Sequence, residues 1–580
     1  MPLSEPSREV GERLFAAGRL TSEQIELVRR RQHRLHIPQH RAVVDLGFVS
    51  EEDAWRELAA CNGLEFVDLC NYEFPPGLPD EKLFPVRLVH HHRVLPLEID
   101  DQSVGLAFVD PPRQSELSNL RLLLNRRVEP MLTSPSCYQN VIRQHFGLGA
   151  DTLLRLDEDV TAEEGSSDVV FDLGQNEDEA QVTAGITHYV DQLLAEAMRL
   201  GATDVHVEPY FARIKLRYRI DGVLQTVRVP DGLRQVYGAL VSRLKIMAGL
   251  NIAEKRLPQD GRITMRTVRE EYDLRVNTVP TKHGEALCLR ILGRQSLMLE
   301  LKELGLQSDQ EETLRDLTRL PQGLVLLTGP TGSGKTTTLY AALTQAYDEG
   351  RKILTIEDPV EYQLEGVVQI QTRDEVGLTF ANGLRAVLRH DPDVVLIGEI
   401  RDTETAEIAV RAAQTGHLVF STLHANDSIN AITRLLEMGI DAFLLGSSLS
   451  ASIAQRLARR VCRHCGEVDS DLPEEVRHEM ATTLGLAEEG IQARRGRGCV
   501  ECGHKGTRGR VAIYEFFIMN EEVADLLGGS IRTGQLRGAA RARGWRSLRE
   551  NGWRQVQSGQ VPAEEICRIT HRVRPVFDAA

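Results

Sequence analysis

The second half of the chain alternates short apolar runs with longer amphipathic stretches. Strands that are covered on both faces read as continuous apolar runs, and helical stretches between them connect neighbouring parallel strands. The pattern therefore predicts an α/β domain with a mostly parallel sheet over residues 319–580. The apolar runs that predict its strands are residues 323–328, 353–356, 394–397 and 418–421.

The middle of the chain shows a different pattern, in which apolar and polar residues alternate. Such alternation predicts half-exposed strands. Together with a helical stretch that begins at residue 182, these strands predict a second α/β domain over residues 182–318. The alternating segments are residues 204–208, 214–220 and 272–276.

The N-terminal part combines helices with a third group of strands. Polar residues that cap helices precede amphipathic stretches at Thr21 and Ser50, which predicts a helical module over residues 1–62. Residues 63–147 form a predicted α/β domain, with helical stretches between its strands. The strands are predicted at residues 63–69, 94–97 and 104–109.

Composition separates these domains and bounds the class of protein. Residues 148–181 are acidic and poor in aromatic residues, which predicts a flexible linker. The 580 residues contain no apolar run near the ~20 residues that cross a bilayer, and no signal sequence, so a soluble cytoplasmic protein is expected. The net charge of −15 is uneven, because residues 532–574 are rich in arginine. These arginines predict a solvated helix face or salt bridges between subunits, with nucleic acid or anionic lipid as alternatives.

One stretch fits the phosphate-binding pattern G-x-x-x-x-G-K-[ST] at every position. It follows an apolar run and precedes a helical stretch, which is the setting that a P-loop requires. Lys335 would neutralise the β- and γ-phosphates and the Thr336 hydroxyl would bind Mg²⁺. The motif comprises Gly329, Pro330, Thr331, Gly332, Ser333, Gly334, Lys335, Thr336 and Thr337.

A candidate catalytic residue, which is acidic, lies at the end of another apolar run. Glu399 follows residues 394–397, where triphosphatases place a group that orients water. Many P-loop proteins carry an acid where Gly398 stands. The alternative for Glu399 is a strand-end salt bridge to Arg401 or Arg389.

The nine cysteines indicate a metal centre. Four of them form two C-x-x-C pairs, and four thiolates make a closed tetrahedral site for structural Zn²⁺. Redox-active thiols are the alternative, and the other five cysteines are predicted to be buried thiols. The proposed ligands are Cys462, Cys465, Cys499 and Cys502. They lie in a predicted zinc subdomain over residues 461–510, which is followed by predicted C-terminal helices over residues 511–580.

The match around Glu399 extends well beyond one motif. Residues 388–402 resemble the signature of the secretion ATPases that drive type II secretion and type IV pilus assembly. Residues 356–361 resemble that family's aspartate box, and residues 415–426 resemble its histidine box. The resemblance implies a RecA-like P-loop core that hydrolyses ATP. It assigns Glu357 and Glu361 to the environment of the metal and water. His417 and His424 would sense the γ-phosphate or support the neighbouring strand.

The domain before this core also resembles the family. Residues 202–209, 217–222 and 256–262 are similar to its second N-terminal domain, which has a PAS-like α/β fold. The resemblance makes Arg217 and Arg219 candidates for arginines that one subunit supplies to its neighbour's triphosphate. Exposed arginines without such a role are the alternative.

The long N-terminal region and the four cysteines resemble the assembly branch of the superfamily, as do residues 455–462. The first segment partly resembles the family's cyclic-di-GMP-binding module, because Gly11, Leu14, Gly18 and Gln32 match one copy of its motif. Other positions depart from the motif, so we predict a protein-docking module in place of dinucleotide binding. The departing residues are Glu9, Pro38 and His40.

These features predict a cytoplasmic, Mg²⁺-dependent ATPase that is peripheral at the inner membrane and, by resemblance, hexameric. It would dock on membrane partners and power assembly of a pilus or a secretion pseudopilus, without specific nucleic acid. Two other classes remain open. One is a DNA-translocating conjugation-type ATPase that uses the basic C-terminal surface, and the other is a non-hydrolysing, nucleotide-gated scaffold.

Overall fold

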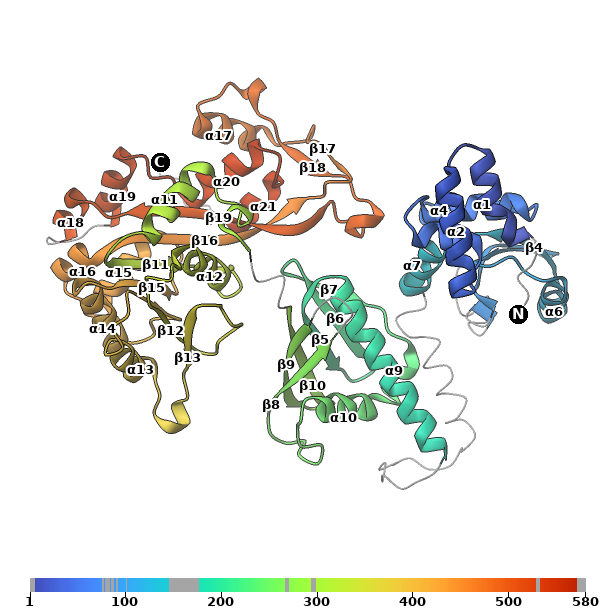
Figure 1. The fold of residues 1–580 in the computed structure, drawn as a ribbon, viewed down its shortest axis with the longest axis horizontal. Coiled ribbons are helices and arrows are strands. Elements are labelled where there is room, and N and C mark those ends of the chain that lie inside the picture. Colours follow the sequence, from blue (N-terminus) through green and yellow to red (C-terminus); the bar gives the residue numbers. More distant parts are fainter. Residues whose placement is uncertain are drawn as a thin grey trace, which may run out of the picture. The chain divides into compact units, whose positions relative to one another are not determined.

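Figure 1 shows the computed structural model of the chain, which describes residues 6–570 except 76–77, 79–83, 85–87, 90–91, 101, 146–176, 267–270, 294–298 and 528–532. Nearly all of the predicted linker, residues 148–181, therefore lies outside the described residues. The chain divides into two compact units. The first comprises residues 1–265 and 273–292, and the second comprises residues 266–272 and 293–580.

Four helices open the first unit, where the helical module is predicted. Thr21 caps the second of them with a reciprocal capping box to Gln24, and the Ser50 side chain caps the fourth. The apolar faces of these helices pack into one core with the strands that follow. The helices are α1 (Pro6–Ala16), α2 (Ser22–Leu35), α3 (Gln39–Asp45) and α4 (Glu51–Cys61).

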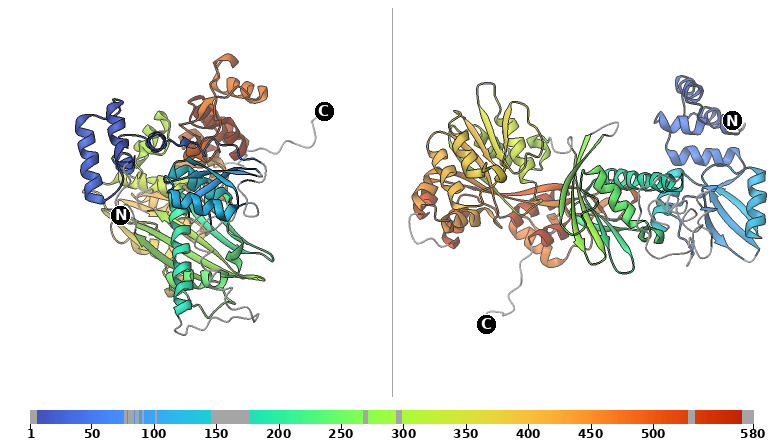
Figure 2. Two further views of the ribbon diagram at one scale, coloured as in Figure 1. Left: turned by 90° about the vertical axis from the view of Figure 1, so that its right-hand side faces the viewer. Right: turned by 90° about the horizontal axis from the view of Figure 1, so that it is seen from below.

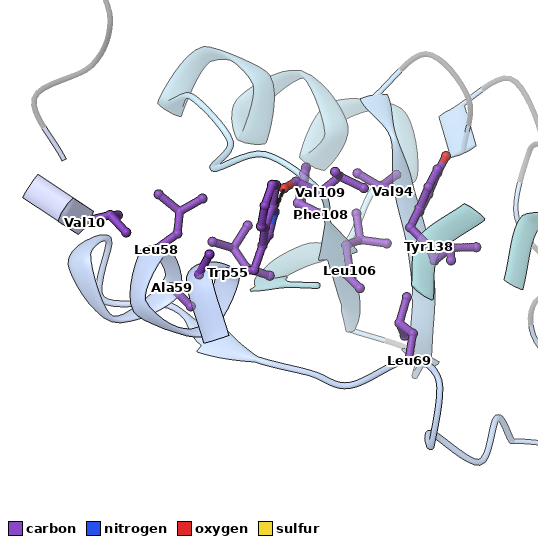
Figure 3. Packing of buried hydrophobic residues seen from close by; sticks show 14 of the residues in the cluster. Val10, Trp55, Leu58, Ala59, Leu69, Val94, Leu106, Phe108, Val109 and Tyr138 are labelled. Atoms are coloured by element: carbon purple, nitrogen blue, oxygen red, sulfur yellow. Dashed lines mark hydrogen bonds between the residues drawn. The ribbon is translucent and has the colours of Figure 1, made fainter. Parts of the chain in front are cut away.

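The strands that follow form a four-stranded sheet in the order β1-β4-β3-β2. The side chains of its core converge in Figure 3, where the Trp55 indole N–H donates to the backbone oxygen of Val109 across 2.8 Å. The first strand is shorter than predicted. The elements are β1 (Glu65–Phe66), β2 (Val94–Ile99), β3 (Ser103–Phe108), α6 (Gln114–Leu124), β4 (Arg127–Leu132) and α7 (Pro135–His145).

The prediction of five buried thiols was wrong. Cys70 and Cys137, which are 67 residues apart, form a disulfide within the N-terminal domain. The three others, Cys61, Cys288 and Cys567, form no disulfide and are only half-buried. The spacing of the cysteines in the sequence does not indicate this pair, because Cys70 follows β1 and Cys137 lies in α7, and only the fold brings them together.

A six-stranded sheet forms the second part of the first unit, in the order β7-β6-β5-β10-β9-β8. Helices α9 and α10 pack beside it, as Figure 2 also shows, and the Tyr218 hydroxyl donates to the Leu193 carbonyl of α9. The helices are α9 (Glu177–Arg199) and α10 (Tyr237–Met247). The strands are β5 (Ala202–Pro209), β6 (Ile214–Ile220), β7 (Val223–Val227), β8 (Gln259–Arg266), β9 (Glu271–Thr281) and β10 (Gly284–Gly293).

The second unit is built on a seven-stranded sheet in the order β13-β12-β14-β15-β11-β16-β19. All neighbours pair in parallel except β16 and β19, which are antiparallel. The four predicted apolar runs are its central strands. The strands are β11 (Gly323–Thr328), β12 (Ile353–Glu357), β13 (Val367–Gln371), β14 (Val394–Ile397), β15 (Leu418–Leu423), β16 (Leu449–Val461) and β19 (Thr507–Ile518).

Helices cover both faces of this sheet. One face packs against α11 (Ser308–Thr318) and α12 (Lys335–Ala346), and the other mainly against α13 to α16, α18 and α19. The predicted C-terminal helices from residue 511 begin instead with β19, because its apolar residues complete the sheet edge. The remaining helices of this face are α13 (Phe380–Val387), α14 (Thr403–Gln414), α15 (Ser428–Glu437), α16 (Ala442–Ser448), α18 (Glu521–Leu527) and α19 (Thr533–Ala542).

A smaller lobe lies at the far end of β16 and β19. Its helices pack around Trp553, which is fully buried, and each of its two cysteine segments joins one long strand of the sheet to one short strand. The elements of this lobe are β17 (Gly466–Val468), α17 (Glu474–Leu484), β18 (Arg494–Gly496), α20 (Leu548–Gln557) and α21 (Ala563–Ile569).

Candidate nucleotide-binding site and metal centre

The loop that carries the phosphate-binding pattern connects β11 to α12. Three of its glycines, Gly329, Gly332 and Gly334, have positive φ angles of 151°, 75° and 87°. A side chain at Gly329 or Gly334 would also collide with the neighbouring strand β16. Glycine is therefore required here both for the backbone turn and for close packing.

Lys335 folds back over this loop. Its Nζ donates to the backbone oxygens of Gly329 at 2.8 Å and of Pro330 at 3.1 Å. Burial lowers the pKa of Lys335, an effect that the Glu399 carboxylate opposes and Arg456 reinforces. Phosphate oxygens could replace these two carbonyls as partners of the ammonium group. The neighbouring Thr336 is exposed at the first turn of α12, in the place where a hydroxyl can bind Mg²⁺.

Strand β16 contributes residues that sequence reasoning did not assign to the site. A Cβ at Gly334 would lie 2.9 Å from Nε2 of Gln455, which packs directly under the loop. The next residue, Arg456, donates to the backbone oxygen of Asn426 at 3.2 Å. The family resemblance of residues 455–457 was the only sequence signal for them.

Glu399, the candidate catalytic base, lies just after β14. One carboxylate oxygen pairs with the Arg401 guanidinium, and the other lies 3.3 Å from Nε2 of His424. The Glu399 side chain is 18 % exposed, and its charge acts on Lys335. The structure thus contains the salt bridge that is the alternative for Glu399, and its carboxylate is also near enough for its charge to act on Lys335.

Gly398 stands where other P-loop proteins often carry an acid. A Cβ at this position would lie 3.3 Å from both the Cα of Glu357 and the backbone oxygen of Ile356. The end of β12 therefore leaves little room for a side chain. Gly398 therefore offers no side-chain ligand at this position.

Glu357 ends β12 and is only 4 % exposed. The Tyr340 hydroxyl and the Thr355 hydroxyl donate to its two oxygens, and Gln369 donates to one of them at 3.2 Å. Burial and the nearby Glu357 charge raise the pKa of Tyr340 well above its ordinary value. Glu361 is half-buried, and its backbone N–H lies 3.4 Å from the same Tyr340 hydroxyl.

The two predicted histidines lie at opposite ends of β15. His424 follows the strand and contacts Glu399, whereas His417 precedes the strand and its Nδ1 lies 3.0 Å from the backbone oxygen of Ala412. Seven residues of extended chain span about 20 Å. His417 therefore lies about the length of the strand away from the end of β15 that carries His424.

The predicted arginines of the first unit both lie on β6 and are both paired. Arg217 is 2.5 Å from a carboxylate oxygen of Glu208. Arg219 donates to the Gly222 carbonyl at 3.0 Å and lies 3.6 Å from Asp204. Each guanidinium would have to exchange a carboxylate on β5 for a phosphate in order to act on a nucleotide.

The four cysteines of the two C-x-x-C pairs come together at the base of the small lobe. All four sulfur atoms lie within 4.8 Å of one another, and three of the separations are 3.8 Å. Zn–S bonds of about 2.3 Å in a tetrahedron place sulfurs about 3.8 Å apart, so these thiols fit Zn²⁺. Although burial favours the neutral thiol, N–H groups of Cys499 and Gly506 hold the pKa of Cys502 down to about 7.

Comparison with known families and proteins agrees with this geometry. The family model of the type II/IV secretion system protein matches residues 179–568, which is more than half of the chain. The chain belongs to this family. The prediction of membership, which rested on the residues around Glu399, is confirmed. A second model, that of the MshEN domain, matches residues 62–152.

Relatives of this secretion family carry names from both of its assembly systems. The chain is 36% identical to the type IV pilus assembly ATPase PilB of Myxococcus xanthus, over 97% of this chain and 98% of that protein. It is 38% identical to the type II secretion system protein E of Xanthomonas campestris, over 90% and 92%. It is also 47% identical to the type II secretion system protein HxcR of Pseudomonas aeruginosa, over 68% and 79%. Among the described residues, no helix has the length and apolar character needed to cross a bilayer.

For this member of the secretion family, replacing Cys462 by Ser is expected to abolish binding of one Zn²⁺ per chain. The free energy of metal binding also stabilises the local fold, so loss of the metal should make residues 461–510 sensitive to protease. Elemental analysis and limited proteolysis measure the two effects, with Cys288→Ser as a control outside the cluster. Absence of zinc from chelator-free wild-type protein would contradict the site.

Proposed function

We propose that the chain is an ATP-hydrolysing motor that powers assembly of a type IV pilus or a type II secretion pseudopilus. The observation that carries this proposal is the convergence of Lys335, Glu399 and His424 at the carboxyl ends of neighbouring strands. Ligands of open α/β sheets bind at this edge. The proposal is further supported by similarity to an assembly ATPase along nearly the whole chain.

Each residue has a defined task in this proposal. Lys335 holds the β- and γ-phosphates, and Thr336 binds Mg²⁺, which neutralises charge on the phosphates when bound. Glu399 accepts a proton from the attacking water, while Arg401 and His424 hold its carboxylate in place. Glu361 helps to position water near the metal. The contacts of Glu357 favour a positioning role through Tyr340.

The motor acts as a homo-oligomeric ring, and we infer a hexamer. Arg217 and Arg219, from a PAS-like domain, complete the site of a neighbouring subunit. The N-terminal domains dock the motor on proteins of the inner membrane, so that it works as a peripheral protein on the cytoplasmic side. The departures at Glu9, Pro38 and His40 argue against cyclic-di-GMP as a ligand of these domains.

Phosphate release by the purified chain tests the hydrolysis part of the proposal. Activity should require Mg²⁺, disappear with a chelator, and remain unchanged when DNA is added, with Lys335→Ala as the background. ATP binding without phosphate release would favour the nucleotide-gated scaffold. DNA-stimulated hydrolysis that falls steeply with salt would favour the DNA translocase.

Assembly in the host cell tests the motor part. A chromosomal Lys335→Ala substitution should remove surface filaments or secreted protein while the variant chain remains present at the wild-type level. Sheared filaments and culture supernatants are compared with those of the wild type. Normal filaments together with normal secretion in cells that hold only the variant would contradict the proposal.

A further inference from the structure

The disulfide of the N-terminal domain lies where three elements meet. Cys70 follows β1, and Cys137 is the third residue of α7. The first turn of α7 is also held by Glu51 of α4, whose carboxylate accepts the N–H and the hydroxyl of Ser136 at 2.8 and 2.6 Å. Leu69 and Tyr138, the sequence neighbours of the two cysteines, are buried in the domain core (Figure 3).

A carboxylate faces the sulfur pair. Oδ1 of Asp68 accepts the N–H of Cys70 at 3.0 Å and lies 3.6 Å from Sγ of Cys137. These three side chains place one oxygen and two sulfur atoms within 4.8 Å. In the reduced protein the Cys137 thiol can thus donate a hydrogen bond to Asp68, whose negative charge favours the protonated thiol.

The surroundings favour a reversible bond over a permanent crosslink. Both cysteines are half-buried, so small thiols and disulfides can reach them. The same chain keeps free thiols elsewhere, among them the four that fit zinc. In compartments where thiols persist, a disulfide is usually transient or redox-sensing. The positive end of α7 also stabilises negative charge on Cys137, the form that attacks disulfides.

We propose that Cys70 and Cys137 form a reversible thiol–disulfide site that fastens the first turn of α7 to the loop after β1. The oxidant is a low-molecular-weight disulfide, RSSR. The Cys137 thiolate attacks one sulfur of RSSR, forming a mixed disulfide and releasing RS⁻. The Cys70 thiolate then displaces the second RS⁻. The two protein protons end on two RSH molecules, and reduction by two RSH reverses the sequence.

Oxidation would therefore change how firmly α7 is held. This helix is the last described element of the N-terminal domain before residue 177. With the bond broken, Glu51 and the core contacts remain but the covalent tie to residue 70 is lost. The site thus senses the thiol–disulfide balance around the N-terminal domains, independently of the nucleotide chemistry.

Thiol trapping of the full-length chain tests the site. The protein is equilibrated with glutathione at increasing GSSG:GSH ratios, quenched with an alkylating agent and analysed by peptide mass spectrometry. Cys70 and Cys137 should lose two hydrogens together and regain them with excess GSH, while Cys61 and Cys567 stay alkylated throughout. Full alkylation of the pair at every ratio, or a stable glutathione adduct on either cysteine, would overturn the proposal.

Two variants sharpen the test. Asp68→Asn keeps the side-chain shape but removes the charge beside Cys137, so oxidation should become faster.

Hydrogen exchange in α7 should increase on reduction of the wild type. It should not respond to GSSG in Cys70→Ser, and Cys61→Ser should behave as the wild type. Zinc bound by the reduced wild type beyond one equivalent, lost in Cys70→Ser and protecting both thiols from alkylation, would overturn the redox site in favour of a metal site.

Discussion

Glu399→Gln is expected to leave ATP binding nearly unchanged and to lower turnover at least about 10²-fold, as for loss of a general base. The amide keeps the shape of the side chain and can still accept a hydrogen bond from Arg401. It cannot accept the proton of water. A 10²-fold loss corresponds to about 2.7 kcal/mol of transition-state stabilisation.

The matched variant is Lys335→Ala, which should fail at the earlier step. It removes the ammonium group that now rests on the Gly329 and Pro330 carbonyls, so ATP binding itself should weaken. Steady-state phosphate release and equilibrium binding of a labelled nucleotide separate the two defects. Wild-type turnover by Glu399→Gln would refute the role of this carboxylate and leave only its salt bridge to Arg401.

Arg401→Ala distinguishes a positioned base from a strand-end ion pair. If the pair with Arg401 were the whole role of Glu399, Glu399→Gln should lower the melting temperature but leave turnover nearly unchanged. Arg401→Ala, which also loses its contact with Asp358, should lower the melting temperature at least as much. A base that is partly held by His424 predicts a small stability change in Glu399→Gln and a large change in turnover.

The strands next to the phosphate-binding pattern could be predicted from sequence because they are buried and apolar. β11, β14 and β15 are buried on both faces, so each is a continuous apolar run next to the motif that it positions. The two C-x-x-C pairs were equally readable, since tetrahedral zinc imposes local spacing. Only their approach across the 33 residues between Cys465 and Cys499 needed the structure.

The other half of the site was hidden because its sequence favours a different local structure. β16 is rich in alanine, arginine and leucine, which are good helix formers, yet it pairs with β11 and β19 throughout. Tertiary pairing overrides that preference. Gln455 therefore packs against the loop at Gly329 and Gly334 from a segment that no periodicity marked as a strand, and Arg456 follows it.

Polar contacts between residues far apart in the chain also could not be predicted from the sequence. The family resemblance assigned Glu357 to the metal and water environment, but only the fold shows that Tyr340 and Gln369 surround its carboxylate. The disulfide of Cys70 and Cys137 is similar, because nothing local to either cysteine indicates its partner.

Complementation between two inactive variants should restore hydrolysis if Arg217 and Arg219 act on a neighbouring subunit. Arg217→Ala/Arg219→Ala chains keep an intact P-loop, and Lys335→Ala chains keep intact arginines. Ring interfaces are head to tail, so random mixing at equal amounts gives both intact parts at roughly a quarter of the interfaces. Each variant alone should be nearly inactive, and the mixture should regain activity in proportion to such interfaces.

The pairing of these arginines in the structure provides the control. Arg217 and Arg219 contact Glu208 and Asp204 on the adjacent strand, so their loss could disturb the domain as well as catalysis. Arg213→Ala, an exposed position just before the same strand, should leave activity unchanged. Melting temperatures of the variants, and their assembly with wild-type chains, show whether folding is intact.

Dependence on assembly gives the same proposal an independent readout. If the arginines of one chain complete the site of another, dilution below the concentration at which rings form should silence the wild type. Specific activity should rise with protein concentration until the rings are complete. Activity that is constant with dilution to monomers, together with mixed rings that recover nothing at any ratio, would place both arginines in a role within their own chain, where Glu208 and Asp204 already hold them.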